Sequence, residues 1–219
     1  MKNIFTAYPD LCDRLRQEAT FLPASALPSA AEWMAAAFCH DPSIRYLLGG
    51  KEQGDGDRDY FLTVLRAVWG KALLLSCTPD AQDLLVLFPP ALKSVPATGF
   101  FRHGGAGLRR HFGLSLYTRS LRYENHCRRV KARFLTPDTW YCLCFAVAPE
   151  RQGQGVGSRL LRPVLRALED ARFSLYLETH REDNVRIYGH FGFRTVDVSV
   201  IPGTDITQYA MLTGDNPPA

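Results

Sequence analysis

The chain has 219 residues, of which 46% are hydrophobic, and its 26 basic and 22 acidic side chains give a net charge of +4. That length and composition suit one domain with a substantial buried core. The small positive excess is compatible with an anionic ligand but is too weak to indicate nucleic-acid binding. No apolar run reaches the ~18 residues of a membrane span and no signal peptide opens the chain, so we expect a cytoplasmic protein without a membrane partner.

The N-terminal part is predicted to be helical. Residues 30–39 read as a helix that Ser29 caps and that residues 40–42 end. A polar, glycine-rich loop is expected over 49–56. A second helix is predicted over 57–69, because its apolar residues fall on one face.

The middle of the chain changes from helix to strand. Residues 71–77 and 83–88 are predicted strands, and the short turn between them indicates a hairpin. Residues 94–118 fit no single element, because several glycines weaken a helix while apolar residues keep helical spacing. A further helix is predicted over 121–134.

The second half alternates most clearly between the two kinds of element. Strands are predicted over 140–148, 173–178, 193–201 and 206–212, and helices over 155–170 and 184–191. Pro163 lies inside the first of these helices, so we expect a kink or an irregular first turn there. Gly192 is expected to end the second helix. This alternation predicts the α/β class, with a mixed sheet.

Two of the six cysteines, Cys142 and Cys144, lie two residues apart in a predicted strand. Because side chains alternate along a strand, we expect both on one face. Their spacing differs from the CxxC pairs of metal and redox sites. The cysteines are therefore expected to be ordinary buried thiols, and no metal is expected.

The most informative segment is the run PERQGQGVGSRLL at 149–161, which follows a predicted strand and opens a predicted helix. Backbone N–H groups at the start of a helix bind phosphate groups. Glycines allow the backbone to approach a ligand closely, because they have no Cβ. The run therefore predicts a site for a phosphate-bearing molecule.

Three classes of phosphate site have this arrangement. A P-loop requires a lysine after its last glycine, whereas Ser158 and Arg159 follow Gly157 here, which excludes that class. A dinucleotide-binding fold stays open, because Glu178 ends the next strand about 20 residues further on, where a ribose-binding acid belongs. Against it, the third glycine is out of register, and too little sequence follows for a doubly wound sheet.

The third class is an acetyl-CoA loop, and it rests on a resemblance. Residues 145–149 (FAVAP) and 152–157 (QGQGVG) are similar to the strand end and the Gln/Arg-x-x-Gly-x-Gly/Ala loop of the GNAT N-acetyltransferase superfamily. Residues 184–193 (NVRIYGHFGF) resemble the Asn-x-x-x-Tyr-x-x-x-Gly-Phe element of one GNAT branch. The resemblance covers about 30–213 and is most specific between Trp140 and Phe193.

The resemblance implies a GNAT fold, in which helices cover both faces of a mixed, strongly twisted sheet with a V-shaped gap between its central strands. It implies one acetyltransferase domain over 1–219, with a helical acceptor-side part over 1–70 and a sheet core over 71–213. Acetyl-CoA would bind within 141–193. The expected activity is transfer of an acetyl group from acetyl-CoA, as cosubstrate, to an amine of a small molecule or peptide. A homodimer is also expected from the resemblance.

The resemblance also implies a cofactor site built from a strand edge, the glycine loop and the later helix. Its residues would be Phe145, Ala146, Val147, Gln152, Gly153, Gln154, Gly155, Val156, Gly157, Ser158, Asn184 and Tyr188. The loop N–H groups over 152–158 would bind the pyrophosphate, and the strand edge would pair with the pantetheine arm. Three nearby arginines are further candidates for phosphate contacts: Arg151, Arg159 and Arg162.

Acetyl transfer to an amine requires a base, an oxyanion donor and an acid for the leaving thiolate. The resemblance offers Tyr188 as the acid, and its ordinary pKa is close to that of a thiol. A backbone N–H near Val147 is the expected oxyanion donor. Glu178 is the first candidate for the base, and the further candidates are His180, Tyr141, Glu124 and His126.

The acceptor cannot be identified from the sequence. Five side chains would contribute to its site if residues 94–135 line the cleft: His103, Arg109, Arg110, Tyr117 and Tyr123. Relatives often carry a His before the Trp-Tyr pair, where this chain has Thr139. That departure leaves a second class open, a CoA-binding regulatory or interaction module without turnover.

Overall fold

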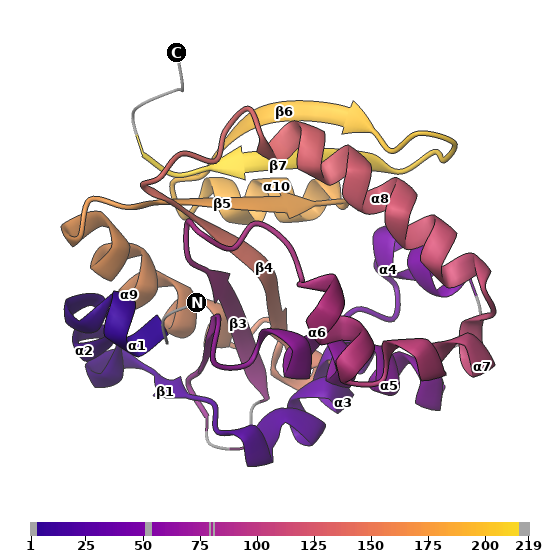
Figure 1. Cartoon of the computed structure of the whole chain (residues 1–219). Coiled ribbons are helices and arrows are strands. Elements are labelled where there is room, and N and C mark those ends of the chain that lie inside the picture. The colour runs from indigo at the N-terminus through magenta and orange to yellow at the C-terminus, as the bar shows by residue number, and fades with distance from the viewer. Residues whose placement is uncertain (1–3, 51–53, 79, 81, 215–219) are drawn as a thin grey trace.

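The computed structural model describes residues 4–50, 54–78, 80 and 82–214. In this part of the chain a seven-stranded sheet has the order β1-β2-β3-β4-β5-β7-β6 (Figure 1). Its strands are β1 Thr20–Phe21, β2 Leu73–Ser76, β3 Asp83–Phe88, β4 Thr139–Val147, β5 Ser174–Thr179, β6 Arg194–Val200 and β7 Thr207–Leu212. Only β4 and β5 pair in parallel, so the sheet is mixed, as expected. The strands change direction strongly from β3 to β6, which confirms the twist.

Helices cover both faces of this sheet (Figure 1). They are α1 Ile4–Ala7, α2 Pro9–Glu18, α3 Leu27–Ala37, α4 Pro42–Leu48, α5 Asp55–Val68, α6 Ala97–Arg102, α7 Arg109–Phe112, α8 Ser115–Lys131, α9 Val156–Asp170 and α10 Glu182–Gly189. Short 3₁₀ turns occupy Ala24–Ala26, Gly105–Leu108 and Pro149–Arg151. α2 and α9 pack in one hydrophobic cluster, and α3 and α5 pack in another on the opposite face.

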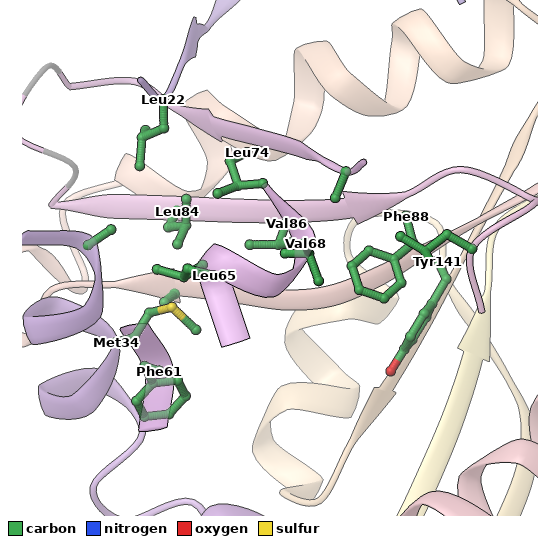
Figure 2. Packing of buried hydrophobic residues seen from close by; sticks show 14 of the residues in the cluster. Leu22, Met34, Phe61, Leu65, Val68, Leu74, Leu84, Val86, Phe88 and Tyr141 are labelled. Carbon is green, nitrogen blue, oxygen red and sulfur yellow. The ribbon is translucent and has the colours of Figure 1, made fainter. Parts of the chain in front are cut away.

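Figure 2 shows the core on the α3 and α5 face. Phe61 and Leu65 of α5 and Met34 of α3 pack there against Leu84 and Val86 of β3. Leu65 and Val86 are completely buried. The apolar face predicted for residues 57–69 is therefore the face that joins α5 to the sheet.

The two central strands part at Cys142. β4 and β5 pair from Thr139 opposite Ser174 to Cys142 opposite Leu177, and beyond that point β4 continues to Val147 without this partner. A β-bulge in the β3–β4 ladder lies at the same level, where Leu143 is an extra residue between two paired positions. A bulge bends its strand, and the result is the V-shaped gap that the resemblance implies.

The bulge also corrects the prediction for the cysteines. Cys142 packs in the same cluster as Trp140, whereas Cys144 contacts the cluster on the opposite face of the sheet. The prediction that they share a face was wrong, because the extra residue Leu143 shifts the alternation by one.

Several N-terminal predictions need correction. α1, α2 and β1 were not predicted, and β1 shows that residues 1–70 are not wholly helical. Ser29 does not cap α3, which begins at Leu27; its Oγ donates to the Asp80 carbonyl at 3.3 Å. Asp41 was predicted only to lie in the segment that ends a helix. It also caps α4, because its Oδ1 accepts from Ser43 N at 2.9 Å. Part of the predicted 49–56 loop and of the 78–82 turn lies outside the described residues.

The ambiguous segment 94–118 folds into α6, a 3₁₀ turn, α7 and the first turn of α8. Two of its glycines lie between the helical turns and separate them. Gly104 is left-handed with φ of 114°, and Gly113 combines a positive φ of 69° with an extended ψ of −177°, a conformation that also favours glycine. α8 begins six residues before the predicted start at 121. α9 runs through Pro163 without a break and its first turn is regular. Gly192, with φ of 86°, lies in the turn after α10.

Candidate functional site

Two cavities meet where β4 and β5 part. The first, called here the loop cavity, has a volume of about 520 Å³ and is lined by the end of β4, the glycine-rich run and α10. The second, called the aromatic cavity, has a volume of about 570 Å³ and lies between α3–α6, α8 and the ends of β4 and β5. Five residues line both: Phe38, Asp41, Phe145, Asn184 and Tyr188. A ligand that occupies the loop cavity can therefore react at this junction with one held in the aromatic cavity.

The loop between β4 and α9 needs its glycines for two different reasons. Gly153 and Gly155 have φ of 75° and 74°, a left-handed conformation that other residues adopt at a cost. Gly157 is restricted by its neighbour instead, because a Cβ there would lie 3.0 Å from Phe145 Cζ. α9 starts at Val156 without a side-chain cap, so the first N–H groups of the helix stay available to an anion.

Most of the predicted loop residues line the loop cavity. They are Gln152, Gly153, Gly155, Val156, Gly157 and Ser158. Gln152 differs from the expectation, because its N–H already donates to the Pro149 carbonyl at 3.2 Å. Its side-chain amide donates to the Val147 carbonyl at 3.0 Å and ties the loop to β4. Gln154 is not among the lining residues, and its amide donates to the Glu150 carbonyl.

The end of β4 presents a polar backbone edge to the loop cavity. Ala148 N donates to the Gln82 carbonyl on the β3 side at 2.8 Å. Because backbone groups alternate along an antiparallel strand, Ala146 also faces β3, while Phe145 and Val147 face the gap. All three residues line the cavity, but the backbone edge open to a ligand belongs to Phe145 and to the Val147 N–H, because the Val147 carbonyl accepts from Gln152.

Two arginines line the loop cavity, Arg151 and Arg181. Arg181, just before α10, was missed because no sequence pattern places it near the glycine run. Arg159 and Arg162 are not among the lining residues, and Arg162 lies over the Phe191 ring at 5.0 Å.

Tyr188 and Asn184 project from α10 toward the junction. The half-buried Tyr188 ring lies between Phe145 and Phe193, with ring centroids 6.5 and 5.6 Å apart. Burial raises the pKa of Tyr188 well above its ordinary value, so its phenol is protonated at neutral pH. Asn184 Nδ2 donates to Thr179 Oγ1 at 3.1 Å and fixes the start of α10 to the end of β5.

Glu178 lines the aromatic cavity at the end of β5, where it accepts three hydrogen bonds. The donors are Tyr141 Oη at 3.0 Å, Tyr176 Oη at 3.1 Å and Gln208 Nε2 at 3.4 Å. Burial raises the pKa of Glu178, although Lys131 and the two phenols favour its charged form. Lys131 lies 4.5 Å over the Tyr141 ring. Glu178 is therefore a half-buried carboxyl group with more affinity for a proton than a fully exposed one.

Three of the other candidate bases also line the aromatic cavity, and one does not. Glu124 and Tyr141 line it, as does His180, whose Nε2 is 3.4 Å from Tyr123 Oη. Burial lowers the pKa of His180, which keeps the imidazole neutral. His126 is not among the lining residues and faces Ser199 Oγ at 3.2 Å.

Thr139 lies at the start of β4, away from the gap. Its Oγ1 is 3.0 Å from Ser174 Oγ and 2.8 Å from Thr136 Oγ1. The residue is buried and lines neither cavity. Its hydroxyl therefore joins β4 to β5 and to the preceding loop.

Some of the expected acceptor-side residues line the aromatic cavity and others do not. Tyr117 and Tyr123 line the aromatic cavity, whereas His103, Arg109 and Arg110 do not. Arg110 instead pairs with Asp59 at 3.1 Å. Sequence reasoning missed the other aromatic lining residues, among them Tyr60 and Phe100, because they come from separate elements.

Within the described residues, no group of three or more His, Cys, Asp or Glu side chains is placed to hold a metal ion. No helix in the described ranges has the length and apolar character that crossing a bilayer requires.

Comparisons with known proteins agree with this geometry. Residues 122–195 match the family model described as acetyltransferase (GNAT) domain. Among solved structures, the chain is similar to one from Corynebacterium glutamicum described as histone acetyltransferase HPA2 and related acetyltransferase, with 20% identity, a TM-score of 0.59, and 92% of this chain and 96% of that one covered. It is also similar to PH1933 from Pyrococcus horikoshii, with 16% identity, a TM-score of 0.53 and coverage of 91% and 96%.

A third similar structure is the PaiA N-acetyltransferase from Thermoplasma acidophilum in complex with coenzyme A. It shares 11% identity and a TM-score of 0.51, and 90% of this chain and 98% of that one are covered. At these identities the solved structures establish the fold.

Proposed function

From the premise that this chain carries a GNAT acetyltransferase domain and is an acyltransferase, we propose that it moves an acetyl group from acetyl-CoA directly to an amine of a small molecule or peptide. The observation that carries the proposal is the junction of the two cavities at Tyr188 and Phe145. One cavity suits a phosphate-bearing donor, and the other holds a separate ligand against it. The whole chain is taken to act as one such domain.

The loop cavity is the proposed site of acetyl-CoA. The N–H groups of residues 153–158, at the start of α9, would hold the pyrophosphate, with Arg151 and Arg181 beside it. The pantetheine amides would pair with the Phe145 backbone and the Val147 N–H, which face the gap. This places the thioester next to Tyr188 at the junction.

This arrangement supplies a group for the oxyanion and for the leaving sulfur of the transfer. The amine lone pair attacks the thioester carbonyl, and an N–H at the end of β4 stabilises the oxyanion that forms. The C–S bond then breaks, and Tyr188 gives its proton to the leaving sulfur. Because its pKa is raised, the Tyr188 phenol is protonated at neutral pH, which is the state that a general acid requires.

Glu178 is the proposed base, and it acts through the Tyr141 hydroxyl that donates to it at 3.0 Å. Proton transfer from the amine to Tyr141, and from Tyr141 to Glu178, leaves the half-buried carboxyl group neutral, and the raised pKa of Glu178 favours this state. His180 is the alternative base in the same cavity.

A CoA-binding module without turnover is the alternative function. Its support was Thr139 in place of a His, but Thr139 lies outside both cavities. The two functions can be separated by incubating the protein with acetyl-CoA and each of a panel of amines. A thiol reagent then measures the free CoA that is released. Release of CoA with any amine supports the enzyme, whereas CoA binding without release across the panel contradicts it.

Two further parts of the proposal concern the setting of the protein. All six cysteines are free thiols, which fits action in a reducing compartment such as the cytoplasm. A homodimer is proposed from the family resemblance, and sedimentation at several concentrations tests it.

A further inference from the structure

The wall of the aromatic cavity is a chain of aromatic rings that begins at the junction. Phe38, at the junction, stacks on Phe61 at 5.8 Å, and Phe61 contacts Tyr60 at 5.4 Å. The chain continues by contacts of 5.7–6.4 Å through three more rings, Phe100, Phe101 and Tyr117. All six rings line the cavity. A ligand in this cavity therefore meets apolar ring surface along its length.

The outer end of this wall is also apolar. Phe101 and Leu121 line the cavity and are 52% and 60% exposed. Tyr117 presents its ring, because its hydroxyl donates to the Gly105 carbonyl at 2.8 Å. Such a wall favours a ligand with an apolar body over a strongly hydrated polycation.

Three carboxylates line the same cavity, but two of them are already engaged. Glu178 accepts hydrogen bonds on both oxygens, and Glu124 lies 3.5 Å from the Lys131 ammonium. Asp41 uses only Oδ1, which accepts from Ser43 N, Ser43 Oγ and Ile44 N at 2.6–3.1 Å. Among the described residues no hydrogen bond to Asp41 Oδ2 is found, and Asp41 is the one carboxylate that lines both cavities.

Asp41 is thus held rigidly by the cap of α4 and directed to the place where the donor and acceptor would meet. The negative charge of Asp41 acts on two neighbouring groups. It helps to raise the pKa of Tyr188, and it raises the pKa of His180, which burial lowers. Arg128 is the cationic side chain of the cavity lining, and it is exposed. The junction is therefore the end of the cavity that suits a single positive charge.

We infer that the acceptor is a primary amine on an apolar, ring-sized body, and that the Asp41 carboxylate binds its ammonium group beside the thioester. This inference rests on the proposed function and names the substrate class of its acceptor site. During attack the amine nitrogen becomes positive again, and the same carboxylate stabilises it. Asp41 therefore selects the amine and holds it in place. The ammonium gives its first proton through Tyr141 to Glu178 before attack, and the second proton, lost from the positive nitrogen of the intermediate, restores Tyr188 after its own proton has gone to the leaving sulfur.

Binding to the complex with CoA tests the inference without requiring turnover. Calorimetry measures 2-phenylethylamine and spermidine on the full chain saturated with CoA. We expect phenylethylamine to bind at least about tenfold more tightly, because spermidine would place further charges against the aromatic wall. Equal binding, or tighter binding of spermidine, would overturn the substrate class.

Variants of Asp41 test the anchor. Asn and Ser cap a helix as well as Asp does, so Asp41→Asn and Asp41→Ser remove the charge and keep α4. Both should weaken phenylethylamine binding about tenfold or more, and the affinity of each variant for CoA is measured alongside. Asp170→Asn, at an exposed ion pair with Arg14, removes the same charge elsewhere and should change neither affinity. Unchanged amine binding in the two Asp41 variants would show that Asp41 is not the anchor.

A parallel thiol-release assay separates this inference from the proposed function. If phenylethylamine binds and depends on Asp41 but no amine releases CoA, the binding site stands and the acetyltransferase function fails. If amines release CoA but phenylethylamine neither binds nor reacts better than spermidine, the function stands and the inference fails.

Discussion

The ring centroids of Tyr188 and Phe145 are 6.5 Å apart, and these residues, from α10 and β4, are two of the five that line both the loop cavity and the aromatic cavity. Phe145 lies on the strand that has lost its β5 partner, and Tyr188 lies on the helix that follows β5. The pair therefore bridges the gap that the parting of β4 and β5 opens. A reaction at the junction takes place beside the phenol of Tyr188.

Replacing Tyr188 with Phe should lower kcat about 10²-fold and leave the KM for acetyl-CoA nearly unchanged, because general acids contribute about that much. Steady-state thiol release measures both constants. Tyr8→Phe is the matched control, because Tyr8 packs against Trp140 outside both cavities. An unaltered kcat in the Tyr188 variant would remove the phenol from the mechanism.

Replacing Gly157 with Val should weaken CoA binding about tenfold or more, because the new side chain meets Phe145 and covers the N–H groups of α9. Calorimetry with CoA measures the change. Gly107→Ala is the control, because a Cβ there meets nothing within 4 Å. Unchanged affinity for CoA in the Gly157 variant would place the pyrophosphate elsewhere.

Replacing Glu178 with Gln should lower kcat and remove the acidic limb of its pH profile. Burial raises the pKa of Glu178 above its ordinary 4.5, so the limb should lie above pH 4.5, with activity lost as the pH falls through the pKa. The profile of kcat against pH, measured for Glu178→Gln and His180→Asn, identifies the base. A limb that persists in the first variant and disappears in the second would assign the role to His180.

The same raised pKa affects stability in a defined direction. A carboxyl group whose pKa is higher in the folded protein than in the unfolded one stabilises the fold at low pH, and this contribution is lost as the pH rises from 4.5 through the folded pKa. The free energy of unfolding of Glu178→Gln should therefore fall less than that of the wild type over this range. Urea unfolding at several pH values measures it, and parallel curves for the two proteins would contradict a raised pKa.

Replacing Thr139 with His should destabilise the protein by about 1–3 kcal/mol without raising kcat, because the larger ring enters a filled site between Thr136 and Ser174. Urea unfolding and thiol release measure the two effects. Thr139→Ser keeps the hydroxyl and is the control. A gain in kcat on introducing His would show that position 139 reaches the acceptor after all.

Replacing Leu65 with Ala should reduce the free energy of unfolding by about 2–5 kcal/mol, because this side chain is completely buried between α5 and the sheet (Figure 2). Urea unfolding measures this change, provided that the dependence of the unfolding free energy on urea concentration is the same for the variant and the wild type. Leu114→Ala is the control, because Leu114 is 70% exposed and should change stability by less than about 0.5 kcal/mol.

The sequence alone determined the elements from β4 to β7 and the residues of the glycine-rich loop. Periodicity reports these elements reliably, because each buries one face along its own length. The need for Gly153 and Gly155 is also local, because a positive φ is a property of a single residue. Tyr188 was predicted from the resemblance of residues 184–193 to a GNAT element, whose spacing a single helix preserves.

Only the tertiary structure decided which side chains face one another. The bulge at Leu143 separates Cys142 from Cys144, and it depends on the register with β3, which the sequence of β4 does not encode. The aromatic wall combines rings from α3, α5, α6 and α8, and Asp41 enters the site only because α4 packs beside α8. Contacts between elements far apart in sequence depend on how whole helices and strands pack, so local pattern identified the glycine-rich loop and packing shaped the aromatic cavity.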